Sequence, residues 1–274
     1  MTADEARLGQ YIEAWKSTAD DTVALLRSLD AEDWSKPTDL PGWDVRAVAA
    51  HLAHLESELA GFEQTPVDVP ELEHVRSPMG TYTEIGPLAR ASWEPTAVVD
   101  ELEQAVSVRF LGLREDPPTD GSADPPRTPG GIGWSWETLL RNRPLDMWMH
   151  EQDIRRAVGR PGDLNTPGAA HTVTVFTMSF AYSVGKRVAP PEATTVVLDV
   201  RGVQPVHLAV GVDAGGRAAL MPSDPEVPTV HLEMDLETFT ILGGGRRPPE
   251  SLDVRVTGDT GLGRRILEAM AVTP

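Results

Sequence analysis

The chain has 274 residues, a formal net charge of −18 and no cysteine. This length favours two compact domains over one. The negative charge argues against nucleic acids and anionic membrane surfaces as partners, since both attract positively charged proteins. Without cysteine the chain has no thiol nucleophile and no thiolate ligand of its own, so thiol chemistry would need a thiol from outside.

The sequence contains no run of about 18 apolar residues that would predict a transmembrane helix, and its first residues lack the pattern of a signal peptide. We therefore expect a cytoplasmic protein.

Apolar residues recur at helical spacing in four segments, namely 3–29, 44–63, 95–114 and 136–158. Four amphipathic helices in succession predict a four-helix bundle. Pro144 interrupts the last segment, so we expect that helix to kink there or to restart with Pro144 in its first turn. Residues 64–94 and 116–131 are rich in proline or glycine and are predicted as long loops.

The pattern changes after a further predicted helix over residues 168–187. Short segments typical of strands follow at 194–200, 205–212, 217–221, 229–234 and 252–257, and helices are expected at 235–242 and 259–270. The turn at 213–216 contains two glycines and joins two of these strands. The second half is therefore predicted as an α+β domain.

One helix of the first half turns ionisable residues towards the protein interior. At 100° per residue, Asp146, His150 and Asp153 lie within about 60° of one another, beside an apolar stripe. On the helix over 44–63, His51 lies at the edge of the apolar stripe, whereas His54 lies about 120° from its centre, towards solvent. His51 is therefore the better inward candidate.

Asp146 and His150, one turn apart, can chelate one metal ion. With His51 they would supply two nitrogens and one oxygen, which leaves a coordination position open, as in catalytic zinc sites. Zinc is the expected metal and nickel is the next choice. The alternative interpretation is structural: His51 would be a satisfied histidine between helices, and Arg143 and Arg156 would pair with solvated Asp146 and Asp153.

Four segments carry a family resemblance. They are Leu40–His54 (LPGWDVRAVAAHLAH), Leu145–Arg155 (LDMWMHEQDIR), Leu236–Arg247 (LETFTILGGGRR) and Val256–Leu267 (VTGDTGLGRRIL). The chain resembles the mycothiol-dependent maleylpyruvate isomerase family over nearly its whole length.

The resemblance implies an α+β protein: a DinB-like metal-binding bundle over residues 1–165, followed by a sterol-carrier-like domain with a mainly antiparallel sheet over residues 166–274. It assigns the metal to His51, Asp146 and His150. The family pattern usually has glutamate at the position of Asp146, and the shorter aspartate must approach the metal more closely or bind it through water.

The resemblance also implies a reaction. Mycothiol would add to a conjugated cis double bond, the bond would rotate, and elimination would give the trans isomer. Asp153 would orient a ligand or shuttle a proton, or else merely pair with Arg156. Arg246 would bind an anionic substrate, or else merely stabilise the end of its helix.

Other functions are compatible with the same residues. A zinc-dependent thiol S-transferase would conjugate an electrophile without isomerising it, and thiol consumption separates the two reactions. A module that binds an apolar ligand would need a continuous apolar cavity, whereas the predicted strands carry Arg201, His207, Asp213 and Glu233. A metal-binding regulatory protein would bind no thiol. The oligomeric state stays open.

Overall fold

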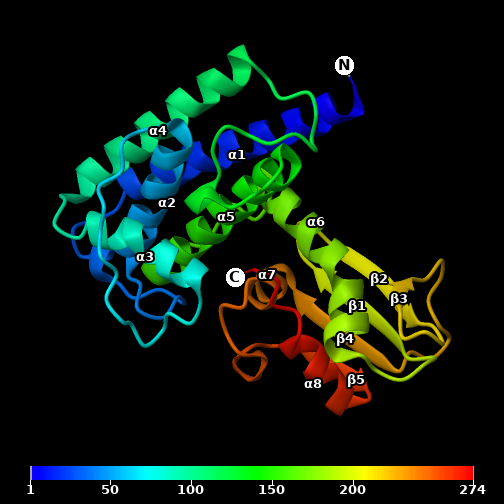
Figure 1. Ribbon diagram of the computed structural model, residues 1–274. Helices are drawn as coiled ribbons and strands as arrows, with labels where there is room; N and C mark the ends of the chain where they lie inside the picture. Colours follow the sequence, from blue (N-terminus) through cyan, green and yellow to red (C-terminus); the bar gives the residue numbers. More distant parts are fainter. Residues whose placement is uncertain (1, 274) are drawn as a thin grey trace. The chain divides into compact units, whose positions relative to one another are not determined.

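The structure is a computed structural model and describes residues 2–273. The chain divides into an N-terminal unit, residues 2–162, and a C-terminal unit, residues 163–273 (Figure 1). The first unit is helical and the second combines helices with a five-stranded sheet. The prediction of an α+β protein with a helical N-terminal part is confirmed.

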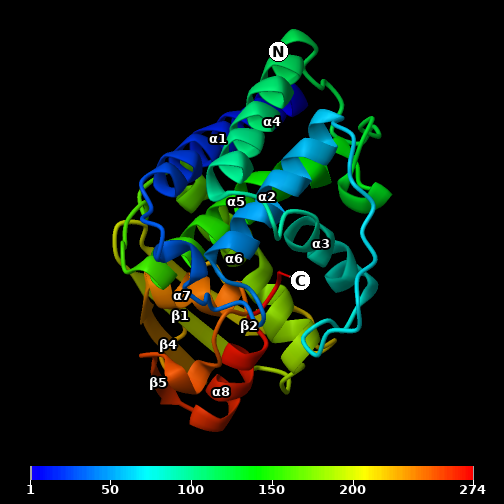
Figure 2. The ribbon, with the colours of Figure 1, turned by 90° about the vertical axis from the view of Figure 1, so that its left-hand side faces the viewer.

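Four long helices form the N-terminal unit: α1 (Ala3–Arg27), α2 (Val45–Ala60), α4 (Pro95–Glu115) and α5 (Trp136–Val158). Helix α1 packs against α4 and α5, and α2 also packs against both, as Figure 2 shows. The core between them contains buried side chains from each helix, among them Leu8, Trp15, Val48, Leu52, Leu102 and Met147. The prediction of four helices in a bundle is confirmed.

Two details of the N-terminal unit differ from the predictions. Residues 64–94 are not a continuous loop, because they contain helix α3 (Pro78–Ala89), which packs against α2. Ser77 caps this helix through the backbone N–H of Gly80, and Pro78 occupies its first position. The prolines that suggested a loop therefore include one that starts a helix. Of the two alternatives expected at Pro144, a restart is wrong, because Pro144 lies inside helix α5, which continues to Val158.

The C-terminal unit begins with α6 (Pro167–Tyr182) and a π-helical turn, η3 (Ser183–Val188). Its strands are β1 (Thr195–Arg201), β2 (Val206–Val212), β3 (Ala218–Leu220), β4 (Val230–Asp235) and β5 (Arg255–Gly258), and its other helices are α7 (Leu236–Gly243) and α8 (Thr260–Glu268). The strand order is β3-β2-β1-β4-β5, and only the β1–β4 pair is parallel. The sheet is mainly antiparallel, as predicted.

On one face of this sheet, histidine and aspartate side chains form a row of hydrogen bonds. The carboxylate of Asp199 on β1 lies 2.6 Å from Nδ1 of His207 on β2 and 2.6 Å from Nε2 of His231 on β4. Nε2 of His207 lies 2.9 Å from a carboxylate oxygen of Asp224. These hydrogen bonds raise the pKa of His207, because both of its ring nitrogens face carboxylate acceptors.

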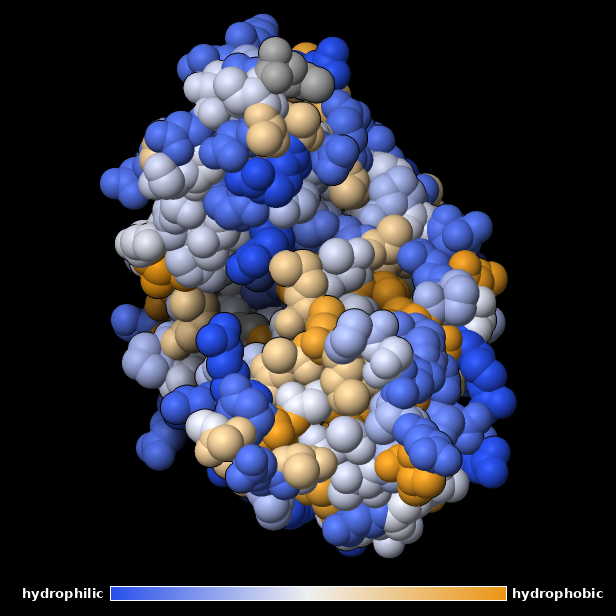
Figure 3. Space-filling model, turned by 90° about the vertical axis from the view of Figure 1, so that its right-hand side faces the viewer, coloured by the Kyte–Doolittle hydropathy of each residue, from blue (hydrophilic) through white to orange (hydrophobic). Residues whose placement is uncertain are grey.

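On the face shown in Figure 3, hydrophobic residues occur in groups among hydrophilic ones. Large exposed hydrophobic side chains are scattered over both units, among them Leu111, Met178, Leu220 and Val227. Among the described residues, no helix combines the length and the apolar composition needed to span a membrane.

Candidate metal centre

Helices α2 and α5 bring three potential metal ligands together. His51, Asp146 and His150 each offer one donor atom, and these atoms all lie within 4.8 Å of one another. The rings of His51 and His150 are 4.9 Å apart, and Nε2 of His150 is 3.6 Å from Oδ1 of Asp146. The two helices are distant in sequence, yet they bring together the three residues that the helical-face argument predicts as ligands.

The local sequence fixes the position of each side chain. Asp44 caps α2 by accepting a hydrogen bond from the backbone N–H of Ala47, and this sets where the helix starts. Val48 and Leu52 are fully buried on either side of His51 along α2, so His51 faces the interior. On α5 the fully buried Met147 directs Asp146 and His150 to the edge of the same core.

His51 is buried and lacks a hydrogen-bond partner for one ring nitrogen. Its Nδ1 is inaccessible to solvent and makes no hydrogen bond. A buried polar atom without a partner costs free energy, and a bound ligand or ion is one explanation for it. This observation disfavours the interpretation of His51 as a satisfied histidine between helices.

The site holds its donors in the forms that bind metal. Burial and, to a smaller extent, the neighbouring His150 together lower the pKa of His51 to about 3, so the imidazole is neutral at pH 7. Burial raises the pKa of Asp146, but the charge and hydrogen bond of Arg143 and the two neighbouring histidines together outweigh this and keep that pKa below its usual range. A divalent cation thus finds a neutral imidazole and an ionised carboxylate.

The lowered pKa of His51 has a consequence for stability. Below pH 6.5 the unfolded chain protonates His51 while the folded protein does not, so folding stability falls as pH decreases towards 3. Between pH 7 and pH 5 this effect should remove about 2 kcal/mol from the unfolding free energy of metal-free protein. Urea titrations at pH 7 and pH 5 measure it, and a His51→Gln variant should lack this part of the pH dependence. An equal loss in both proteins would contradict the assignment.

Asp153 contacts His150 on the side away from Asp146. One carboxylate oxygen of Asp153 lies 3.2 Å from Nδ1 of His150, and the other accepts a 2.5 Å hydrogen bond from Arg156. Asp153 is fully buried. The expected pairing with Arg156 is therefore present, but Asp153 is not the solvated residue of the structural alternative. A carboxylate in this position fixes the ring orientation of a metal-binding histidine.

Trp43 covers the histidines. Its ring lies 4.9 Å from that of His51 and 6.1 Å from that of His150, and its Nε1–H donates to Glu84 on α3. The tryptophan is buried and gives the site an aromatic wall. This contact limits the access of water on that side.

The prediction that His54 faces solvent was wrong. Only 3 % of His54 is exposed, because α3 lies over that side of α2. A Cβ atom at Gly86 of α3 would stand 2.7 Å from Cβ of His54, so the close approach of the two helices needs glycine there. Arg90 faces Nδ1 of His54 at 3.4 Å. Burial, followed by the Arg90 charge, lowers the pKa of His54.

The sequence analysis also missed a buried charged network behind the site. Glu56 on α2 is completely buried and accepts hydrogen bonds from Arg109, Arg143 and Trp15. Arg143 also contacts Asp146. A signal existed, because Glu56 lies one turn after the buried Leu52, on the apolar side of its helix.

Arg246 lies in the C-terminal unit, just after α7. Its guanidinium donates a 2.8 Å hydrogen bond to the carbonyl of Gly244, so the side chain turns back on the end of the helix. Such a contact is expected for the structural role of an arginine at a helix C-terminus. A role in substrate binding stays a prediction.

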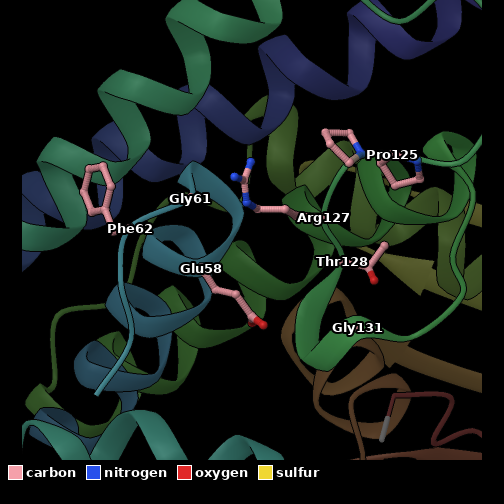
Figure 4. Close-up of a pocket in the computed structure, with 8 residues that line it drawn as sticks. Glu58, Gly61, Phe62, Pro125, Arg127, Thr128 and Gly131 are labelled. Atoms are coloured by element: carbon pink, nitrogen blue, oxygen red, sulfur yellow. The ribbon is translucent and has the colours of Figure 1, made fainter. Parts of the chain in front are cut away.

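A polar cavity of about 470 Å³ lies at the C-terminal end of α2 (Figure 4). Glu58 and Arg127 give it both signs of charge, and Phe62 and two prolines add apolar contacts. Glu58 is two helical turns after His51 and accepts hydrogen bonds from Tyr82 and from the backbone N–H of Gly130. This lining suits a polar ligand better than an apolar one.

Two family models match the chain. Residues 15–155 match the mycothiol maleylpyruvate isomerase N-terminal domain, and residues 170–265 match the corresponding C-terminal domain. No curated protein matches the sequence.

Two solved structures have a similar fold. They are the mycothiol-dependent maleylpyruvate isomerase and a histidine-to-alanine mutant of that enzyme. Each is 18 % identical to this chain, with a TM-score of 0.54, and the match covers 94 % of this chain and 96 % of the other. At this identity the likeness supports the fold alone.

Proposed function

The chain belongs to the mycothiol-dependent maleylpyruvate isomerase family, and from this premise we propose that it is a metal-dependent enzyme that uses an external thiol. The thiol is mycothiol, and the substrate is a small, anionic electrophile with a conjugated double bond. The observation that carries the proposal is the group of His51, Asp146 and His150, whose donor atoms lie within 4.8 Å of one another.

The donor set fits a divalent metal. Two imidazoles and one carboxylate would hold the ion and, with only three protein donors, would leave room for an external ligand. The Nδ1 atom of His51, which is buried without a hydrogen-bond partner, fits a site that binds a ligand or ion. Zinc is the proposed metal, with nickel as the alternative. A metal here would supply Lewis acidity, which favours the thiolate form of a thiol at neutral pH.

In this proposal the side chains of the site have separate tasks. Asp153 accepts a hydrogen bond from the Nδ1–H group of His150. The lone pair on Nε2 of the same ring, which faces Asp146, is then available to a metal ion. Trp43 covers the imidazoles and excludes water. Arg246 is proposed to bind the anionic group of the substrate.

The proposed reaction forms and then breaks one carbon–sulfur bond. The thiol gives up its proton, its sulfur adds to one carbon of the cis double bond, and the π electrons move onto the conjugated carbonyl group. Rotation about the resulting single bond follows. Loss of the sulfur then restores the double bond in the trans geometry, and the thiol is released unchanged. In an S-transferase the first step would stand alone, and each turnover would consume one thiol.

A combined metal and thiol assay tests the proposal. We expect metal-free protein to bind about one equivalent of zinc or cobalt, and mycothiol to add a sulfur-to-cobalt charge-transfer band in the cobalt protein. Turnover of maleylpyruvate should leave the thiol concentration constant, whereas its consumption would indicate a transferase. An Arg246→Gln variant should raise KM for the anionic substrate and leave the charge-transfer band unchanged. Absence of metal uptake would refute the proposal.

A further inference from the structure

We propose that Arg143 is a positioning residue that restricts Asp146 to a single metal-binding oxygen. The inference rests on the proposed function, because it concerns how one ligand of the same metal is held. Arg143 lies on α5, one turn before Asp146, and only 1 % of it is exposed. It touches none of the reacting atoms and would act through Asp146.

The contact with Asp146 uses one carboxylate oxygen and leaves the other. Nη1 of Arg143 donates a 2.8 Å hydrogen bond to Oδ2 of Asp146. Oδ1 is the oxygen nearer to the imidazole of His150, with 3.6 Å between Oδ1 and Nε2. The two oxygens of Asp146 are therefore divided between the arginine and the metal group.

Arg143 is itself held on its other edge. Its Nε and Nη2 both donate to Oε1 of Glu56, at 3.1 Å and 2.8 Å. Glu56 is held in turn by Arg109, which donates a 2.6 Å hydrogen bond to Oε2. An arginine fixed by three of its N–H groups in a buried site has little freedom to release Asp146.

The charges in this chain of contacts balance. Glu56 and Asp146 carry one negative charge each, and Arg109 and Arg143 carry one positive charge each. Arg143 therefore withdraws part of the negative charge that Asp146 would otherwise donate to the metal. A metal with less donated charge is a stronger Lewis acid towards an incoming thiol.

The single oxygen matters for the open coordination position. Two imidazole nitrogens and one oxygen leave the fourth position of a tetrahedral metal free for an external ligand. If both oxygens of Asp146 bound the metal, the carboxylate would occupy that position as well. Arg143 thus keeps the site accessible to the thiol by engaging Oδ2.

Cobalt substitution distinguishes this role from a structural one. Four-coordinate Co²⁺ absorbs visible light much more strongly than five- or six-coordinate Co²⁺, so its d–d band reports the coordination number. The variants are Arg143→Gln, Arg143→Lys and, as a matched control, Arg109→Gln. The control removes another buried arginine from the same glutamate, and Arg109 makes no hydrogen bond to Asp146.

We expect Arg143→Gln to weaken Co²⁺ binding by about 10- to 100-fold, the range found when a group that supports a metal ligand is lost, and to reduce the d–d absorptivity several-fold. Arg109→Gln should change the affinity and the absorptivity much less, because Arg109 contacts Glu56 and not Asp146. Each of these two variants should lower thermal stability. Arg143→Lys should recover part of the absorptivity, because an ammonium group can still bond Oδ2.

Equal spectra and affinities for the Arg143→Gln and Arg109→Gln variants would overturn the inference while leaving the proposed function intact. If the unmodified protein binds no cobalt, the proposed function and this inference both fail. If Arg143→Gln does not fold, a crystal structure of the zinc-loaded unmodified protein decides the question. Binding through Oδ1 alone supports the inference, and binding through both oxygens refutes it.

Discussion

Replacing His150 by alanine should abolish stoichiometric metal binding. The variant keeps His51 and Asp146, but these lie on different helices and no longer form part of a three-donor group. Loss of a direct ligand should cost at least the 100-fold in affinity that loss of a supporting partner can cost. Elemental analysis of protein purified without added metal, followed by zinc titration against a competing chelator, measures the effect.

The matched control is His54→Ala. His54 is also a buried histidine on α2, one turn from His51, yet it is not part of the donor group. This variant should retain about one equivalent of metal. Thermal unfolding gives a second readout, because a metal at 100 times its Kd stabilises the folded state by about 2.7 kcal/mol. Equal metal content in the two variants would show that His150 is not a ligand.

Glu56→Gln should strongly destabilise the N-terminal unit. The glutamate is completely buried and compensates the charges of Arg109 and Arg143. Removing one partner of a buried ion pair leaves uncompensated charge and costs about 3–5 kcal/mol. The total stability of a domain is about 5–15 kcal/mol, so the unit should unfold at clearly lower urea concentration.

Tryptophan fluorescence measures this loss selectively, because all seven tryptophans lie between Trp15 and Trp148, in the N-terminal unit. The control is Glu13→Gln, which breaks the exposed pair with Arg114. Exposed pairs contribute about 0–1 kcal/mol, so this variant should unfold almost as the unmodified protein does. A loss below about 1 kcal/mol for Glu56→Gln would show that water or local rearrangement compensates the buried arginines.

The elements of this fold could be predicted where the apolar pattern was long and regular. The four long helices and the change to strands after η3 follow from periodicity, since a helix or strand with one buried face repeats its apolar residues at 3.6 or 2 positions. Helix α3 could not be found in this way. It is short and contains Pro87 as well as Pro78, so its sequence resembles a loop.

The candidate site was predictable in part for the same reason. His51, Asp146 and His150 lie at the edges of apolar stripes, and a helical-face argument selects such residues. The burial of His54 depends on α3, so missing that helix meant missing the burial. The partners of Glu56 lie 53 and 87 positions away, at Arg109 and Arg143, and sequence spacing does not reveal such contacts.

The distribution of donors between α2 and α5 also concerns how the protein assembles. His51 and Asp146 are 95 positions apart in the chain. Asp146 and His150 form a chelating pair as soon as α5 is helical, whereas His51 joins them only when α2 and α5 have docked. Because only the docked form offers all three donors, a metal bound by them would link α2 to α5 across a long stretch of chain and stabilise the folded state by preferential binding. The supply of metal during folding would then determine how stably α5 is docked against α2.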